Sequence, residues 1–104
     1  MARPYSDKFV IGLENANPKR LGIQLAKLCV KANLPATHVA DTFGVSRQTI
    51  HNWFRGSAIR HRHLANVENY IEILEESLAE GSLPAPTLAH AKVYLESHPK
   101  LNVR

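Results

Sequence analysis

Proline and glycine divide this chain into short segments, and that division most constrains how it can fold. Pro18, Pro35, Gly44, Gly56 and Gly81 interrupt the sequence at intervals that allow only short or medium-length elements. Within the intervals, apolar residues recur three or four positions apart, which is the spacing of one helix face. The pattern therefore predicts an all-α protein.

About five helices are expected, and local signals place their ends. Asn17 and Ser46 are natural N-caps, and Gly44 and Gly81 are natural C-terminal stops. The expected helices run from Pro18 to near Asn33, Pro35 to Phe43, Arg47 to about Phe54, about Arg60 to Glu80, and roughly Thr87 to Ser97.

Three regions follow from these boundaries. Residues 1–16 are expected to be an N-terminal arm, either a short strand or an irregular segment packed on the core. Residues 17–80 form the main domain, including the long fourth helix. Residues 81–104 form a C-terminal helix and tail that caps the core or dimerises.

Composition narrows the compartment and excludes some classes. The 104 residues suffice for one small domain, and the single cysteine, Cys29, permits no intrachain disulfide, which fits a reducing cytosol. No apolar run approaches the roughly 20 residues that a membrane span needs. The first eight residues lack the apolar core of a signal peptide. We expect a cytoplasmic protein without a membrane partner.

Charge is segregated along the chain. Between residues 17 and 62 there are eight basic residues and one acid, Asp41, whereas residues 63–97 hold six glutamates and one lysine. A basic half joined to an acidic half suggests one face for a polyanion and another turned away from it. Solvated surface on both halves is the alternative that charge alone leaves open.

The most informative stretch runs from Leu34 to Gly56. It predicts two short helices joined by a tight turn at Gly44, with Ala40 small enough for close helix packing. The outward positions of the second helix are polar and none is acidic. Arg can bond the guanine edge, and Gln or Asn the adenine edge, in the major groove of DNA.

Residues 44–56, GVSRQTIHNWFRG, resemble the turn and recognition helix of the lambda-repressor-like, or Cro/XRE-type, helix-turn-helix family. The resemblance covers residues 18 to about 75. It implies a DNA-binding domain, here with an extended fourth helix, in a bacterial or phage setting. Two positions depart from the family pattern. Ala36 stands where Gln is frequent, and Phe54 stands where Glu is common and is expected to pack under the fourth helix.

The resemblance also implies which residues contact DNA. The expected base-reading residues are Arg47, Gln48, Thr49, His51 and Asn52. The expected phosphate contacts at family positions are Ser46 and Arg55, with Thr37 added near the start of the preceding helix. The basic residues Lys19, Arg60 and Arg62 are expected to contact phosphate because of their charge. Arg3 and Lys8 would reach the minor groove if residues 1–16 were a flexible arm.

The residues give little support for catalysis or metal binding. Cys29 lies in an apolar stripe with no base identified beside it, so it is expected to be buried, and no catalytic residue is assigned. Trp53 shares a face with Ile50 and is expected in the core. The spacing of His61 and His63 matches no structural zinc pattern, so neither a metal nor a cofactor is expected.

The fourth helix carries a regular apolar seam that either covers the core or dimerises. Together with the fifth helix it predicts a homodimer interface. The residues assigned to it are Leu64, Val67, Ile71, Leu74, Leu78, Leu88, Tyr94 and Leu95.

These observations predict a sequence-specific regulator of transcription that binds double-stranded DNA as a dimer and acts as a repressor, not as an enzyme. Two alternatives use the same scaffold: a protein-interaction adaptor, and an accessory protein of DNA packaging or recombination.

Overall fold

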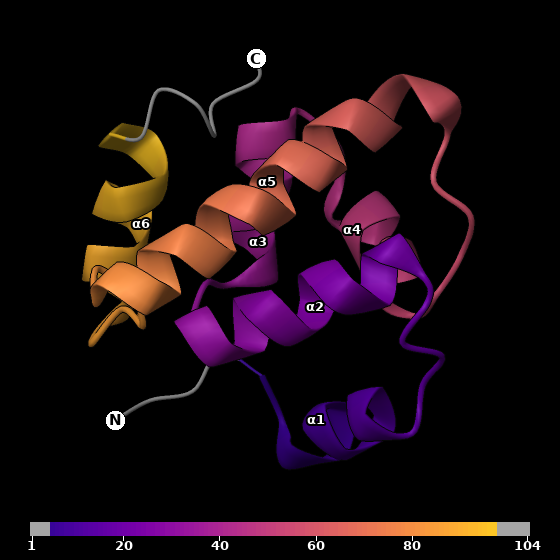
Figure 1. Ribbon diagram of the computed structural model, residues 1–104, viewed down its shortest axis with the longest axis horizontal. Helices are drawn as coiled ribbons and strands as arrows, with labels where there is room; N and C mark the ends of the chain where they lie inside the picture. The colour runs from indigo at the N-terminus through magenta and orange to yellow at the C-terminus, as the bar shows by residue number, and fades with distance from the viewer. Residues whose placement is uncertain (1–4, 98–104) are drawn as a thin grey trace.

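The computed structural model describes residues 5–97, which form six α-helices and no strand (Figure 1). The all-α prediction is confirmed, but the expected number of helices was too low. The helices are α1 (Asp7–Glu14), α2 (Leu21–Ala32), α3 (Ala36–Phe43), α4 (Arg47–Phe54), α5 (His61–Glu80) and α6 (Leu88–Ser97).

The additional helix is α1, within the segment predicted to be an arm. Ser6 caps it by accepting a hydrogen bond from the Phe9 amide at 3.2 Å. The negative charge of Asp7 in the first turn interacts favourably with the positive end of the helix dipole. Leu13 is buried against the rest of the chain, and Lys8 lies in the helix. The prediction of a strand or irregular arm was therefore wrong for these residues, and Arg3 lies outside the described residues.

Two further boundaries differ from expectation. α2 begins at Leu21 because Asn17 and Pro18 form a preceding turn, in which the Asn17 side chain accepts from the Lys19 amide at 3.0 Å. Pro35 is the N-cap of α3 and not its first helical residue. Gly44 and Gly81 end their helices in the left-handed conformation that glycine favours, as predicted.

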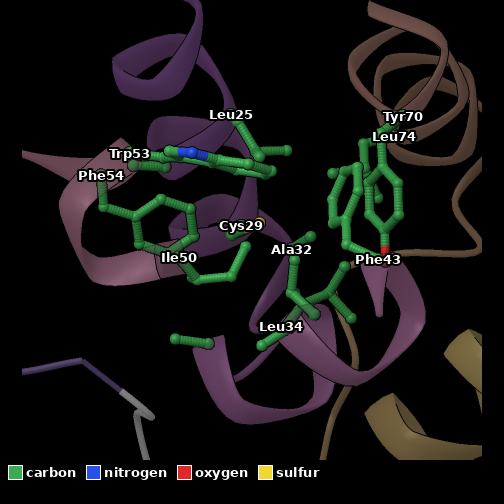
Figure 2. Packing of buried hydrophobic residues seen from close by; sticks show 14 of the residues in the cluster. Leu25, Cys29, Ala32, Leu34, Phe43, Ile50, Trp53, Phe54, Tyr70 and Leu74 are labelled. Atoms are coloured by element: carbon green, nitrogen blue, oxygen red, sulfur yellow. The ribbon is translucent and has the colours of Figure 1, made fainter. Parts of the chain in front are cut away.

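The core lies where α2 contacts both α4 and α5. Phe43 of α3 stacks on Tyr70 of α5 with ring centroids 4.3 Å apart and meets the edge of Trp53 of α4 at 5.5 Å (Figure 2). Trp53 is only 3% exposed and Cys29 is fully buried, so both core predictions are confirmed. Burial raises the pKa of the Cys29 thiol above its ordinary range.

Phe54 is also buried. Its ring lies 6.3 Å from the rings of Tyr5 and Phe9, which stack on each other at 5.3 Å. The Tyr5 hydroxyl donates to the carbonyl of Leu34 at 2.6 Å. Tyr5 and the α1 residue Phe9 therefore cover Phe54 at the C-terminal end of α4.

The C-terminal segment is joined to the other end of the molecule, away from α4 (Figure 1). The Asn33 side chain donates to the carbonyl of Ala85 at 3.1 Å, and the Ala85 amide donates to the carbonyl of Ala32 at 2.9 Å. Ser77 of α5 and the hydroxyl of Tyr94 in α6 share a hydrogen bond of 2.7 Å. Residues 81–97 are thus part of the same core.

The predicted dimer seam is largely used inside the protomer. Val67, Leu74 and Leu95 are buried in the core, so their assignment to a dimer interface was wrong. Leu64, Ile71, Leu78 and Tyr94 are half-buried, and Leu88 is exposed. No helix within residues 5–97 has both the length and the apolar character needed to cross a bilayer.

Candidate nucleic-acid interface

α4 is held with one face in the core and one face outward. Ile50, Trp53 and Phe54 are buried, and the turn before them is closed by a hydrogen bond of 3.1 Å from the Val45 amide to the Ala40 carbonyl. Ser46 caps the helix as predicted, because its side-chain oxygen accepts from the Thr49 amide at 3.1 Å. This packing fixes which side chains of α4 face solvent.

The outward face of α4 presents Arg47, Gln48 and Asn52, all of them exposed. The Gln48 side-chain amide donates to the Asn52 side-chain oxygen at 3.0 Å, so the two amides lie side by side. Thr49 and His51 are half-buried, and the Thr49 hydroxyl shares a hydrogen bond of 2.9 Å with Ser46. Three predicted base-reading residues are thus fully presented, while Thr49 is partly committed to the cap.

A polar cleft lies beside α4, between this helix and the loop that leads into α5. Its volume is about 480 Å³. The lining residues are Gly44, Val45, Ser46, Thr49, Asn52, Trp53, Ser57, Ala58, Arg60, Arg62 and His63. The cleft brings together five of the predicted contacts: Ser46, Thr49, Asn52, Arg60 and Arg62. The N-terminal ends of both α4 and α5 lie at its walls.

The other predicted contacts lie outside this cleft. Arg55 is the exposed C-cap of α4, Thr37 is half-buried in α3, and Lys19 is exposed in the turn before α2. The first turns of α3, α4 and α5 contain no acidic residue.

His63 has a structural role in the cleft that the sequence analysis missed. Its ring lies 5.3 Å from the Trp53 ring, and its Nε2 accepts a hydrogen bond of 3.3 Å from the Arg62 Nε. Burial, and then the nearby charges of Arg62 and Arg60, lower the pKa of His63. The alternation of Arg and His over residues 60–63 was visible, but the contact with Trp53 depends on the tertiary fold.

The charges of α5 oppose its own helix dipole. Arg60 and Arg62 lie at the N-terminal end, where the dipole is positive, and Glu75, Glu76 and Glu80 lie toward the negative C-terminal end. Such a placement within the first or last turn typically costs about 0.3–1 kcal/mol at an exposed site. An anion in the cleft would offset the positive charge of both arginines and of two helix ends.

Within residues 5–97, no three His, Cys, Asp or Glu side chains come together in a group that could hold a metal ion. Comparison of the chain with protein-family models, with curated proteins and with solved structures found no match in any of the three.

Proposed function

We propose that this protein is a sequence-specific regulator that binds double-stranded DNA through a helix-turn-helix unit of the lambda-repressor-like type formed by α3 and α4. The observation that carries the proposal is the exposed, acid-free face of α4 beside a cleft bordered by Arg60 and Arg62. That combination offers groups for base edges next to groups for phosphate.

Base reading is assigned to the exposed side chains of α4. Arg47 is suited to the two acceptors of a guanine edge, and Gln48 and Asn52 are suited to adenine. Because Gln48 donates to Asn52, Asn52 keeps its own amide hydrogens for a base acceptor, and Gln48 keeps its carbonyl oxygen for a donor. The two amides would therefore act as a pair toward one adenine or two neighbouring bases.

Phosphate binding is assigned to the cleft. The N-terminal end of α4 supplies partial positive charge, and Arg60 and Arg62 supply full charges. A backbone phosphate in this position would relieve the unfavourable charge placement at the start of α5. Four of the five glutamates of α5, at positions 72, 75, 76 and 80, lie in its C-terminal half, which would keep that end of the molecule away from the duplex.

The proposed protein would act by occupying a site on DNA and not by catalysing a reaction. A dimer reading two half-sites would bind on one face of the duplex with half-site centres about one helical turn apart. Bound over a promoter, it would exclude the transcription machinery and act as a repressor.

Selection of bound duplexes from a random DNA pool, followed by sequencing, tests the proposal. The expected result is an enriched motif whose affinity falls steeply with salt, as phosphate contacts require. A two-fold symmetric motif supports a dimeric regulator, whereas a single asymmetric motif supports a DNA reader that binds as a monomer. Enrichment of no sequence, with binding insensitive to salt, would overturn the proposal in favour of a protein-interaction adaptor.

A further inference from the structure

The exposed apolar surface of this chain is concentrated at two places. Among the described residues, the large apolar side chains most open to solvent are Ile11 of α1, 58% exposed, and Leu88 and Val93 of α6, 47% and 62% exposed. The seam of α5 offers much less, because Val67 and Leu74 belong to the core. A second copy would therefore find its apolar contacts on α1 or on α6.

α1 borders a groove that the chain itself leaves open. The groove lies between α1 and α2, has a volume of about 320 Å³ and is walled by Val10, Leu13 and Val30. Of the residues of α1, only Leu13 is buried. Val10 and Val30 remain half-buried, and Ile11 follows Val10 on the adjoining exposed surface of α1. The helix is thus attached by one side and unpartnered on another.

The charged residues around this groove are complementary to those around the same groove in a second copy of the chain. Glu14 stands on the α1 side, and Lys27 and Lys31 stand on the α2 side. These three residues form no ion pair with any part of the chain that the structure describes. A two-fold axis through the groove would place Glu14 of each copy against the lysines of the other, so both charge pairs would form at once.

The surface of α6 lacks this property. Its Lys92 already faces Glu96 of the same helix at 4.0 Å, four residues along the chain. A contact through Leu88 and Val93 would gain apolar burial but no complementary charge from that pair. The two surfaces are therefore not equivalent as sites for a second copy.

We infer that this chain forms a two-fold symmetric homodimer in which α1 of each copy lies against the α1–α2 groove of the other. Val10 and Ile11 supply the apolar contact, and Glu14 pairs with Lys27 and Lys31 across the axis. This inference names the surface on which the dimeric part of the proposed function rests, and it is independent of whether the chain binds DNA.

Sedimentation equilibrium of the full chain without DNA tests the interface. The 11.6 kDa chain is expected to reach twice that mass as concentration rises. Ile11→Glu should abolish the dimer, because it places charge in the contact while changing a side chain that is exposed in the monomer. Leu88→Glu is the matched control on α6 and should dimerise like the wild type. Equal helix content by circular dichroism verifies that both variants fold.

Charge exchange provides a second test that does not depend on one variant. Glu14→Lys alone, and Lys27→Glu with Lys31→Glu alone, should each raise the dimer dissociation constant roughly tenfold, because symmetry counts every altered pair twice. Mixing the two variants should restore dimers, since lysine at position 14 then faces glutamates at positions 27 and 31 and the reverse pairs also match.

The inference is overturned by a chain that stays monomeric up to about millimolar concentration, where even a weak contact would be populated. It is also overturned by loss of the dimer in Leu88→Glu but not in Ile11→Glu, which would assign the contact to α6. A mixture of the charge variants that remains monomeric would remove the proposed pairing. Each outcome is read without DNA, so none bears on the proposed base reading.

Discussion

Gly22 of α2 packs directly against the backbone of Trp53 in α4. A Cβ built at position 22 would lie 2.7 Å from the carbonyl carbon of Trp53 and closer still to its oxygen. No flexible side chain is available to move aside, because the obstructing atoms are main chain. The contact therefore sets how closely α4, with its outward polar face, can approach α2.

Gly22→Ala should destabilise the fold. Overpacking of this kind typically costs about 1–3 kcal/mol, even though alanine is the better helix former. Thermal unfolding should show a midpoint lowered by roughly 4–8 °C for each kcal/mol. Gly12→Ala is the matched control, since position 12 is also helical but a Cβ there meets nothing within 4 Å. It should leave the midpoint unchanged or raise it; an equal loss in both variants would contradict the steric argument.

A buried hydrogen bond joins α3 to α5. The Thr42 hydroxyl donates to the carbonyl of Val39 at 2.8 Å, which leaves its oxygen to accept from the hydroxyl of Tyr70. Tyr70→Phe should cost about 1 kcal/mol, because Thr42 keeps its own donor bond. Thr42→Val should cost more, about 1–3 kcal/mol, because the Tyr70 hydroxyl is then buried without this partner.

Urea unfolding of the two single variants and the double variant measures this coupling. The double variant should lose less stability than the sum of the single losses, since the second substitution removes a group that is already unpaired. Additive losses would show that the two hydroxyls do not depend on each other.

The sequence was most informative where helix ends carry local chemistry. Ser46 and Gly44 determine the start of α4 and the end of α3 through a side-chain cap and a positive φ, so both boundaries were predictable. α1 was missed although Ser6 and Asp7 are an N-cap signal, because its eight residues carry weak periodicity and bury only one side chain. Its contact with Phe54 involves residues far apart in sequence and has no local signature.

The seam of α5 shows a second limit of sequence patterns. Residues spaced as in Val67, Leu74 and Leu78 indicate an apolar face but not what covers it. Here α2 covers much of that face, and Tyr94 of α6 reaches Ser77. The polar cleft was predictable as a set of residue types but not as a shape, because its walls come from α4 and from the loop before α5.

Stability should depend on pH through His63. Its pKa is lower in the folded chain than its ordinary value of 6.5. Burial of the imidazole is the largest cause, and the positive charges of Arg62 and Arg60 lower the pKa further. The unfolded chain therefore binds more protons between the two pKa values, and stability falls as pH decreases through 6.5. Urea unfolding at pH 7.5 and 5.5 should show a smaller loss on acidification in His63→Gln than in the wild type.

His61→Gln is the comparison for that experiment, because it removes an exposed imidazole two residues away by the same substitution. The difference between the two variants isolates the contact of His63 with Trp53 and Arg62. If both variants respond to acid identically, His63 has no special part in the pH dependence.

Phosphate binding and base reading should be separable by their response to salt. Arg60→Ala should weaken binding to every duplex and reduce the slope of log affinity against log salt by about 1 for each phosphate that is no longer neutralised. Asn52→Ala should keep that slope and cost about 1–3 kcal/mol at the preferred base, so the enriched motif changes. Titration of fluorescent duplexes at several salt concentrations measures both quantities.

Lys92→Ala is the control for that titration, because it removes a basic residue from α6, at the end of the molecule away from α4. It should alter neither the slope nor the motif. In the proposed orientation, Arg60→Ala should change the salt slope and Asn52→Ala should change the motif. The reason is that Arg60 lines the cleft, whereas Asn52 also presents its amide on the outward face of α4. A change of motif in Arg60→Ala with none in Asn52→Ala would mean that the loop before α5, and not α4, enters the groove.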